Sequence, residues 1–222
     1  MIPEQSCFVT GTDTGVGKTL VSAALVLALR ERGFRAAGIK PLASGAARTR
    51  EGLRNEDGNL LLSVSSSGYD YEHINPVVLE PAIAPHIAAE EAGVRLSARQ
   101  LAAAANPVQT GDRLVVEGVG GWLVPLSDAE SMADVAQLLD FPVLLVVALR
   151  LGALNHALLT AEQIRQQGLT LGGWVATEPD PDTARRDANF AYLKHALPTP
   201  CLGRVPFLET PTPERVRDYL AG

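Results

Sequence analysis

The sequence lacks several features that would place it in common protein classes. Among its 222 residues there are only two cysteines, Cys7 and Cys201, and neither has a Cys or His neighbour at metal-ligand spacing. This argues against a disulfide framework, and we expect both cysteines to be small packing residues. No apolar run approaches the roughly 20 residues needed to span a bilayer, and the N-terminal residues show no signal-peptide pattern. We therefore expect a cytoplasmic protein without a membrane partner.

Basic clusters and aromatic residues are also scarce. The formal net charge is −6 and aromatic residues make up 5%, with no basic stripe of the kind that marks a nucleic-acid surface. We expect no nucleic-acid partner. Hydrophobic residues, by contrast, make up 46% of the chain and charged residues 20%, which suits a well-formed core. The length predicts a single domain over residues 1–222.

Apolar runs of strand length alternate with helical stretches along the chain. Strands are predicted at residues 7–12, 34–41, 113–119, 141–149, 169–177 and 201–207. Helices are predicted at residues 17–32, 97–105, 132–140, 153–168 and 182–196. Strands that are continuously apolar are typical of a parallel sheet with helices on both faces. We predict an α/β fold, a P-loop NTPase-like, doubly wound and mainly parallel sheet that binds ligands at the carboxyl ends of its strands.

Two segments are not assigned by these patterns. Residues 42–59 are polar and contain glycine, and they are too long for a simple connector. Residues 75–93 are interrupted by proline and show no clear period. Both segments lie between the strands predicted at 34–41 and 113–119.

Residues 11–19, GTDTGVGKT, lie between a predicted strand and a predicted helix. A strand, a glycine-bearing turn and Lys-Thr at a helix start form the context of a phosphate-binding loop. The unpaired N–H groups and positive end of the helix favour an anion there. Lys18 would reach the β- and γ-phosphates, and Thr19 would ligate Mg²⁺. The first glycine stands one position earlier than in the common pattern, and Thr12 occupies its usual place.

Charged residues also lie at the ends of two further predicted strands and in the polar segment between those strands. Glu117 follows an apolar run, where a carboxylate can meet Mg²⁺ from the side opposite the loop. Glu51, Glu56 and Asp57 are candidates for a second acid, and chemistry alone does not choose among them. Lys40 would bring a second ammonium group to the same rim of the sheet. Two lysines suggest that charge also builds up on the phosphoryl acceptor, an anionic oxygen such as a carboxylate or carbamate.

Together these motifs resemble the dethiobiotin synthetase family. The segments VTGTDTGVGKT, AGIKPLASG, EGLRNED, VVEGVGGWLVPL, RLGALNHALLTAEQI and GRVPFL occur in the family's order over nearly the whole chain. The resemblance implies a P-loop α/β homodimer, a ligase of biotin biosynthesis that uses ATP and Mg²⁺. It would close a ureido ring on 7,8-diaminononanoate with CO₂, by way of a carbamate and a carbamic–phosphoric mixed anhydride.

The resemblance also implies a role for individual residues. The implied catalytic residues are Lys40, Lys18 and Thr14, and the implied Mg²⁺ ligands are Thr19, Asp57 and Glu117. Substrate would be bound by Ser44 and, across the dimer interface at a helix start, by Leu151, Gly152 and Asn155. The implied nucleotide-binding residues are Gly15, Val16, Gly17, Lys18, Thr19, Leu20, Asp57, Glu117, Gly118, Val119, Gly120, Thr177, Glu178, Pro206, Phe207 and Leu208.

Two positions depart from the family pattern. Gly15 stands where the best-known members carry glutamate, and Thr177 stands where asparagine is usual. A hydroxyl lacks the paired donor and acceptor of an amide, so base selectivity stays open and residues 206–208 are expected to carry more of it. Two alternatives are a partitioning-type ATPase switch, which would carry a second lysine where this chain has Asp13, and a cobyrinate-type amide synthetase, which would need a further glutaminase domain.

Overall fold

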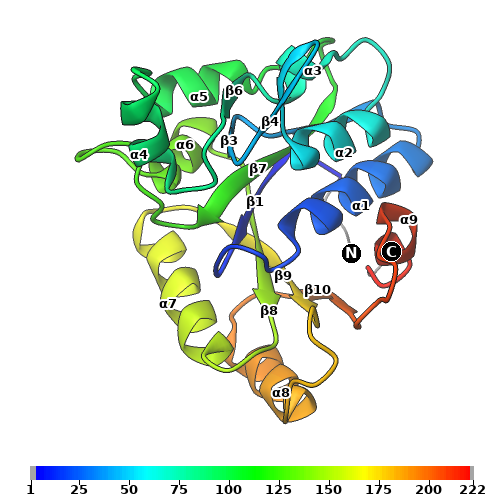
Figure 1. The fold of residues 1–222 in the computed structure, drawn as a ribbon. Coiled ribbons are helices and arrows are strands. Elements are labelled where there is room, and N and C mark those ends of the chain that lie inside the picture. Colours follow the sequence, from blue (N-terminus) through cyan, green and yellow to red (C-terminus); the bar gives the residue numbers. More distant parts are fainter. Residues whose placement is uncertain (1–3, 221–222) are drawn as a thin grey trace.

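The computed structural model describes residues 4–220, and its central element is a six-stranded sheet in the order β10-β9-β8-β1-β7-β2 (Figure 1). All neighbouring strands run parallel. The strands are β1 (Cys7–Gly11), β2 (Ala36–Ile39), β7 (Arg113–Gly121), β8 (Val143–Ala148), β9 (Leu171–Thr177) and β10 (Cys201–Val205). The predicted α/β, P-loop type of parallel sheet is confirmed.

Helices cover both faces of this sheet because its central strands are apolar on both sides. In β8, Leu144 and Val146 belong to the main core cluster, which also includes α1 (Lys18–Glu31). Leu145 and Val147 belong to a second cluster beneath α7 (Ala153–Gln166) and α8 (Arg186–Ala196). Figure 1 shows α7 and α8 together on one side of the sheet and α1 on the other. The continuous apolar run therefore reflects burial of alternate residues on opposite faces.

The chain between β2 and β7 forms a layer of small elements that packs against β2 and α1. β3 (Leu42–Ser44) pairs with β6 (Val77–Leu79), and β4 (Ala47–Thr49) and β5 (Gly52–Arg54) form an antiparallel hairpin. The helices here are α2 (Glu56–Val64), α3 (Tyr71–Ile74), α4 (Pro85–Glu91) and α5 (Ala98–Ala104). This layer contains both segments that the sequence patterns left unassigned.

Several predicted boundaries differ from the structure. The second strand is shorter than predicted, at residues 36–39, and the helix predicted at 182–196 begins at Arg186, after Arg185 adopts a left-handed conformation (φ 57°). The last strand ends at Val205, because Pro206 cannot donate to a strand ladder. α6 (Met132–Leu139) agrees with its prediction, whereas α9 (Pro213–Arg217), which packs against α1, was not predicted. Among residues 4–220, no helix has the length and apolar character required to cross a bilayer.

Candidate active site

The glycine-bearing loop joins β1 to α1 at the carboxyl edge of the sheet. Gly15 (φ 71°) and Gly17 (φ 87°) adopt the left-handed conformation that glycine accommodates without strain. α1 begins at Lys18, and the Lys18 Nζ donates to the backbone carbonyl of Asp13 at 2.9 Å, so its ammonium group lies back over the loop. This is the conformation in which backbone N–H groups and a lysine can surround a phosphate.

The electrostatic environment of Lys18 favours a bound anion. Burial, assisted by the ammonium group of Lys40, lowers the pKa of Lys18 to about 8. A phosphate placed against Lys18 would supply the negative charge that its surroundings only partly provide, and would restore the protonated form.

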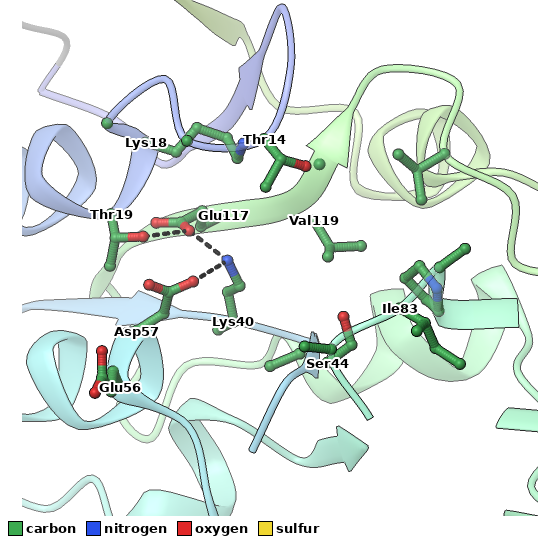
Figure 2. Close-up of a pocket in the computed structure, with 18 of the residues that line it drawn as sticks. Thr14, Lys18, Thr19, Lys40, Ser44, Glu56, Asp57, Ile83, Glu117 and Val119 are labelled. Atoms are coloured by element: carbon green, nitrogen blue, oxygen red, sulfur yellow. Dashed lines mark hydrogen bonds and ion pairs between the residues drawn. The ribbon is translucent and has the colours of Figure 1, made fainter. Parts of the chain in front are cut away.

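Beside the loop, Lys40 lies between two carboxylates (Figure 2). Its Nζ is 2.5 Å from Glu117 Oε1 and 2.8 Å from Asp57 Oδ2, and the Thr19 hydroxyl donates to the same Glu117 oxygen at 2.9 Å. Glu117 is 0% exposed and Lys40 is 3% exposed. Desolvation alone would lower the pKa of Lys40, but the two carboxylates outweigh it and raise that pKa. The three predicted metal ligands and the second lysine thus form one cluster, in which Glu117 and Lys40 are buried and Thr19 and Asp57 are partly exposed.

The donor set of this cluster fits a hard divalent cation. Thr19, Asp57 and Glu117 offer only oxygen atoms, which Mg²⁺ prefers. Glu117 Oε2 is buried and has no hydrogen-bond partner within residues 4–220. The ammonium group of Lys40 already pairs with both carboxylates, so the site accommodates a positive charge. No group of three or more His, Cys, Asp or Glu residues in the described chain could hold a metal by itself. An ion here would therefore need the hydroxyl, water and phosphate oxygens as well, which is the usual coordination of Mg²⁺ in phosphoryl transfer.

A cavity of about 890 Å³ opens beside the cluster. Thr14 and Ser44, both predicted site residues, line it together with Lys18, Lys40 and the cluster carboxylates (Figure 2). The cavity is also lined by apolar side chains, including Ile83 and Val124, which the sequence did not indicate. Ile83 comes from the unassigned, proline-interrupted segment, so no periodic signal marked it.

A second cavity of about 300 Å³ lies on the other side of the loop. It is lined by predicted nucleotide-binding residues: Gly15, Val16, Gly17, Leu20, Thr177, Glu178, Pro206, Phe207 and Leu208. Its two polar side chains are already engaged. The Thr177 hydroxyl donates to the Val16 carbonyl at 2.8 Å, and the Glu178 carboxylate pairs with Arg204 at 2.5 Å and with Arg186 at 3.4 Å.

Some predicted site residues line neither cavity. Gly118 is buried behind the cluster, where an added Cβ would approach the Phe8 ring to 3.1 Å. Leu151, Gly152 and Asn155 lie at the start of α7, and Leu151 is 100% exposed. These three residues therefore line neither cavity of their own chain.

A contact that the sequence did not indicate joins the loop to this region. The Arg150 guanidinium lies 2.5 Å from the Asp13 carboxylate, although 137 positions separate the two residues. The ion pair connects the phosphate loop to the segment that precedes α7. Because both residues are isolated charges in the sequence, no local pattern could have revealed the pair.

An all-parallel sheet, a glycine loop opening a helix and a lysine–carboxylate cluster at the strand ends define the P-loop nucleotide-dependent class. A family model described as an AAA domain matches residues 5–215. Among solved structures, the MinC:MinD cell division complex of Aquifex aeolicus is 11% identical with a TM-score of 0.55, covering 92% of this chain and 82% of that one. The signal recognition particle receptor FtsY of Elizabethkingia anophelis with GDP is 16% identical with a TM-score of 0.50, covering 95% and 58%. These likenesses show the fold alone.

Full-length relatives define the family. The ATP-dependent dethiobiotin synthetase of Pseudomonas aeruginosa strain UCBPP-PA14 is 52% identical over 215 residues, covering 96% of this chain and 94% of that protein. The enzyme of the same name from Cellvibrio japonicus is 48% identical over 218 residues, covering 98% and 96%. The chain belongs to the ATP-dependent dethiobiotin synthetase family, and it is an ATP-dependent ligase.

Proposed function

We propose that the chain closes the ureido ring of dethiobiotin on 7,8-diaminononanoate and CO₂, with ATP as the phosphoryl donor and Mg²⁺ as cofactor. The observation that carries this proposal is the second buried lysine, Lys40, which lines the same cavity as the phosphate-loop lysine, Lys18. A phosphate site that only hydrolyses ATP needs no second ammonium group beside the acceptor position, whereas an anionic acceptor does. Family membership supports the same reaction over the partitioning ATPase and the amide synthetase.

The acceptor in this proposal is a carbamate, formed when one substrate amine adds to CO₂ and loses a proton. Thr14 and Ser44 line the cavity and would contact the diamine end of the substrate. Lys40 would pair with the carbamate, whose negative charge suits a buried ammonium group. Thr19, Asp57 and Glu117 would hold Mg²⁺, which would neutralise charge on the phosphates of ATP.

Phosphoryl transfer then activates the carbamate for ring closure. A carbamate oxygen forms a bond to the γ-phosphorus as the bond to ADP breaks, giving the mixed anhydride. The second amine attacks the carbamate carbon and loses its proton, and phosphate leaves with the oxygen it received. Lys18 would stabilise charge on the transferring group, and Lys40 charge on the acceptor, through pre-placed ammonium groups in a buried site.

We further propose a cytoplasmic homodimer in which the start of α7 completes the substrate site of the partner. Leu151 is fully exposed, so its side chain is accessible to a second subunit. Gly152 and Asn155 would then present the N-terminus of α7 to the distal carboxylate of the substrate, which is a favourable end for an anion.

The test is the coupling of phosphate release to the diamine. Purified protein with MgATP and bicarbonate should release phosphate only when 7,8-diaminononanoate is present, and dethiobiotin should form in equal amount. Equal phosphate release with and without the diamine would refute the synthetase proposal and leave a simple ATPase.

A further inference from the structure

Three proposed site residues lie on three different elements above one buried polar cluster. Lys40 follows β2, Ser44 ends β3, and Asp57 lies in the first turn of α2. Beneath them are the side chains of Asn55, Tyr71 and Asn75, which are 8%, 6% and 2% exposed. None of the three lines either cavity, so none can touch substrate or nucleotide directly.

The first part of the cluster holds the backbone of Lys40. Asn75 Nδ2 donates to the Lys40 carbonyl at 2.6 Å, and the Lys40 N–H donates to the Ile74 carbonyl at 2.7 Å. Asn75 is held in turn by Tyr71, whose hydroxyl donates to Asn75 Oδ1 at 3.1 Å. The end of α3 therefore determines where the Lys40 side chain begins.

The second part holds the other two site residues. The Tyr71 hydroxyl accepts from the Asn55 N–H at 2.6 Å. The Asn55 side chain accepts from the Asp57 N–H at 3.0 Å, as the cap of α2, and donates to the Ser44 carbonyl at 3.2 Å. One hydroxyl thus joins the residue that holds Lys40 to the residue that holds Asp57 and Ser44.

Close packing of α2 fixes the same geometry. A Cβ added at Gly58 would lie 2.9 Å from Asn75 Oδ1 and 3.1 Å from the Tyr71 ring, too close for either atom to keep its place. The turn of α2 that follows Asp57 therefore packs closely against Tyr71 and Asn75, and little free space remains between α2 and α3.

We propose that Asn55, Tyr71 and Asn75 are positioning residues that set Lys40, Asp57 and Ser44 relative to one another for the acceptor half of the reaction. The inference rests on the proposed function. In the hydrogen bonds described, the phosphate loop contacts none of Asn55, Tyr71 and Asn75, so nucleotide binding by the loop is separable from the placement that these three residues provide. Displacement of a reacting group by about 1 Å can cost about a hundredfold in rate.

The test compares two buried tyrosine hydroxyls. Tyr71→Phe removes the central hydroxyl and keeps the ring on which the Arg54 guanidinium stacks at 4.1 Å. Tyr69→Phe is the matched control, because the Tyr69 hydroxyl also makes two hydrogen bonds, to Asp112 at 2.9 Å and from the Val108 N–H at 3.1 Å, and lines neither cavity. We expect kcat of Tyr71→Phe to fall about 10- to 100-fold, with the Kd of a non-hydrolysable ATP analogue within about twofold of wild type.

Each outcome decides between positioning and mere support of the fold. Equal loss of kcat in both variants, or parallel losses of kcat and nucleotide affinity in Tyr71→Phe, would overturn the proposal. Asn75→Leu, which is close in size, adds no charge and removes the donor to Lys40, should reproduce the loss of kcat and serves if Tyr71→Phe does not fold. Dethiobiotin formation by wild type is measured first: its absence would contradict the proposed function, whereas a wild-type rate retained by Tyr71→Phe and Asn75→Leu would contradict the positioning role alone.

Discussion

Replacing Lys40 by methionine tests the lysine–carboxylate cluster at the centre of the site. Methionine keeps most of the volume but removes the cation that faces Glu117 and Asp57 at 2.5 and 2.8 Å. Removing one partner of a buried ion pair destabilises a protein by about 3–5 kcal/mol. Because the Asp57 side chain is 40% exposed and can be rehydrated, we expect the lower end of that range, about 3 kcal/mol.

Magnesium should recover part of this loss in the Lys40→Met variant. With the ammonium group gone, both carboxylates and Thr19 face a site that a metal cation can neutralise. An ion present at ten times its dissociation constant stabilises the folded state by about 1.4 kcal/mol. In wild-type protein the ion must first displace Lys40 from the carboxylates, so the stabilisation by Mg²⁺ alone should be smaller.

The assay is urea unfolding of wild type and Lys40→Met, each with and without Mg²⁺, alongside turnover. Lys194→Met is the matched control, since Lys194 is exposed on α8, and it should change neither quantity measurably. A Lys40→Met protein as stable as wild type, or one that Mg²⁺ stabilises no more than wild type, would refute the reading of Lys40 as the cation that neutralises the metal ligands.

Three further predictions concern nucleotide binding, base selectivity and pH. Lys18→Ala should weaken both nucleotide affinity and turnover, whereas Lys40→Ala should abolish turnover with nucleotide affinity nearly intact in a fluorescent ATP titration; equal losses of affinity would contradict this. Because Thr177 and Glu178 are already hydrogen-bonded, a base meets mainly apolar side chains, and kcat/KM for ATP, CTP and GTP should agree within about a hundredfold; a preference of about 10⁴-fold would show that polar groups read the base. Burial raises the pKa of the Cys7 thiol to about 12, from 9.0. The unfolded thiol therefore ionises first, and the stability of wild type relative to Cys7→Ala should fall by about 1.4 kcal/mol between pH 7 and pH 10; a pH-independent difference in urea unfolding would contradict this.

The parts of the fold that the sequence revealed are those with strong local signals. β8 is a continuous apolar run, and α1 follows a glycine turn, so both were predicted from pattern alone. β3, β4, β5 and β6 are three residues long each, too short for a period to be detected. The β4–β5 hairpin is largely exposed and has no apolar face that could mark it as strand.

The same distinction applies to the site. Lys18 and Thr19 begin the helix after β1, and Glu117 follows the apolar residues of β7, so the parallel sheet places all three toward its carboxyl edge. Asp57 was one of three acids in a polar segment, and only the family resemblance selected it. The structure places it against Lys40 because α2 begins at that point. Contacts such as Asn75 to Lys40 join positions 35 residues apart, and a single sequence carries no record of such pairs.

Transfer of oxygen from CO₂ to phosphate would identify the phosphoryl acceptor. In a rapid-quench reaction begun with C¹⁸O₂, 7,8-diaminononanoate and MgATP, a phosphorylated carbamate requires that the released phosphate carry one ¹⁸O atom from CO₂. We expect this label in the phosphate, with dethiobiotin formed in equal amount. Phosphate that takes its new oxygen from solvent water would contradict the proposed function, because the anion held beside Lys40 would then not be the phosphoryl acceptor.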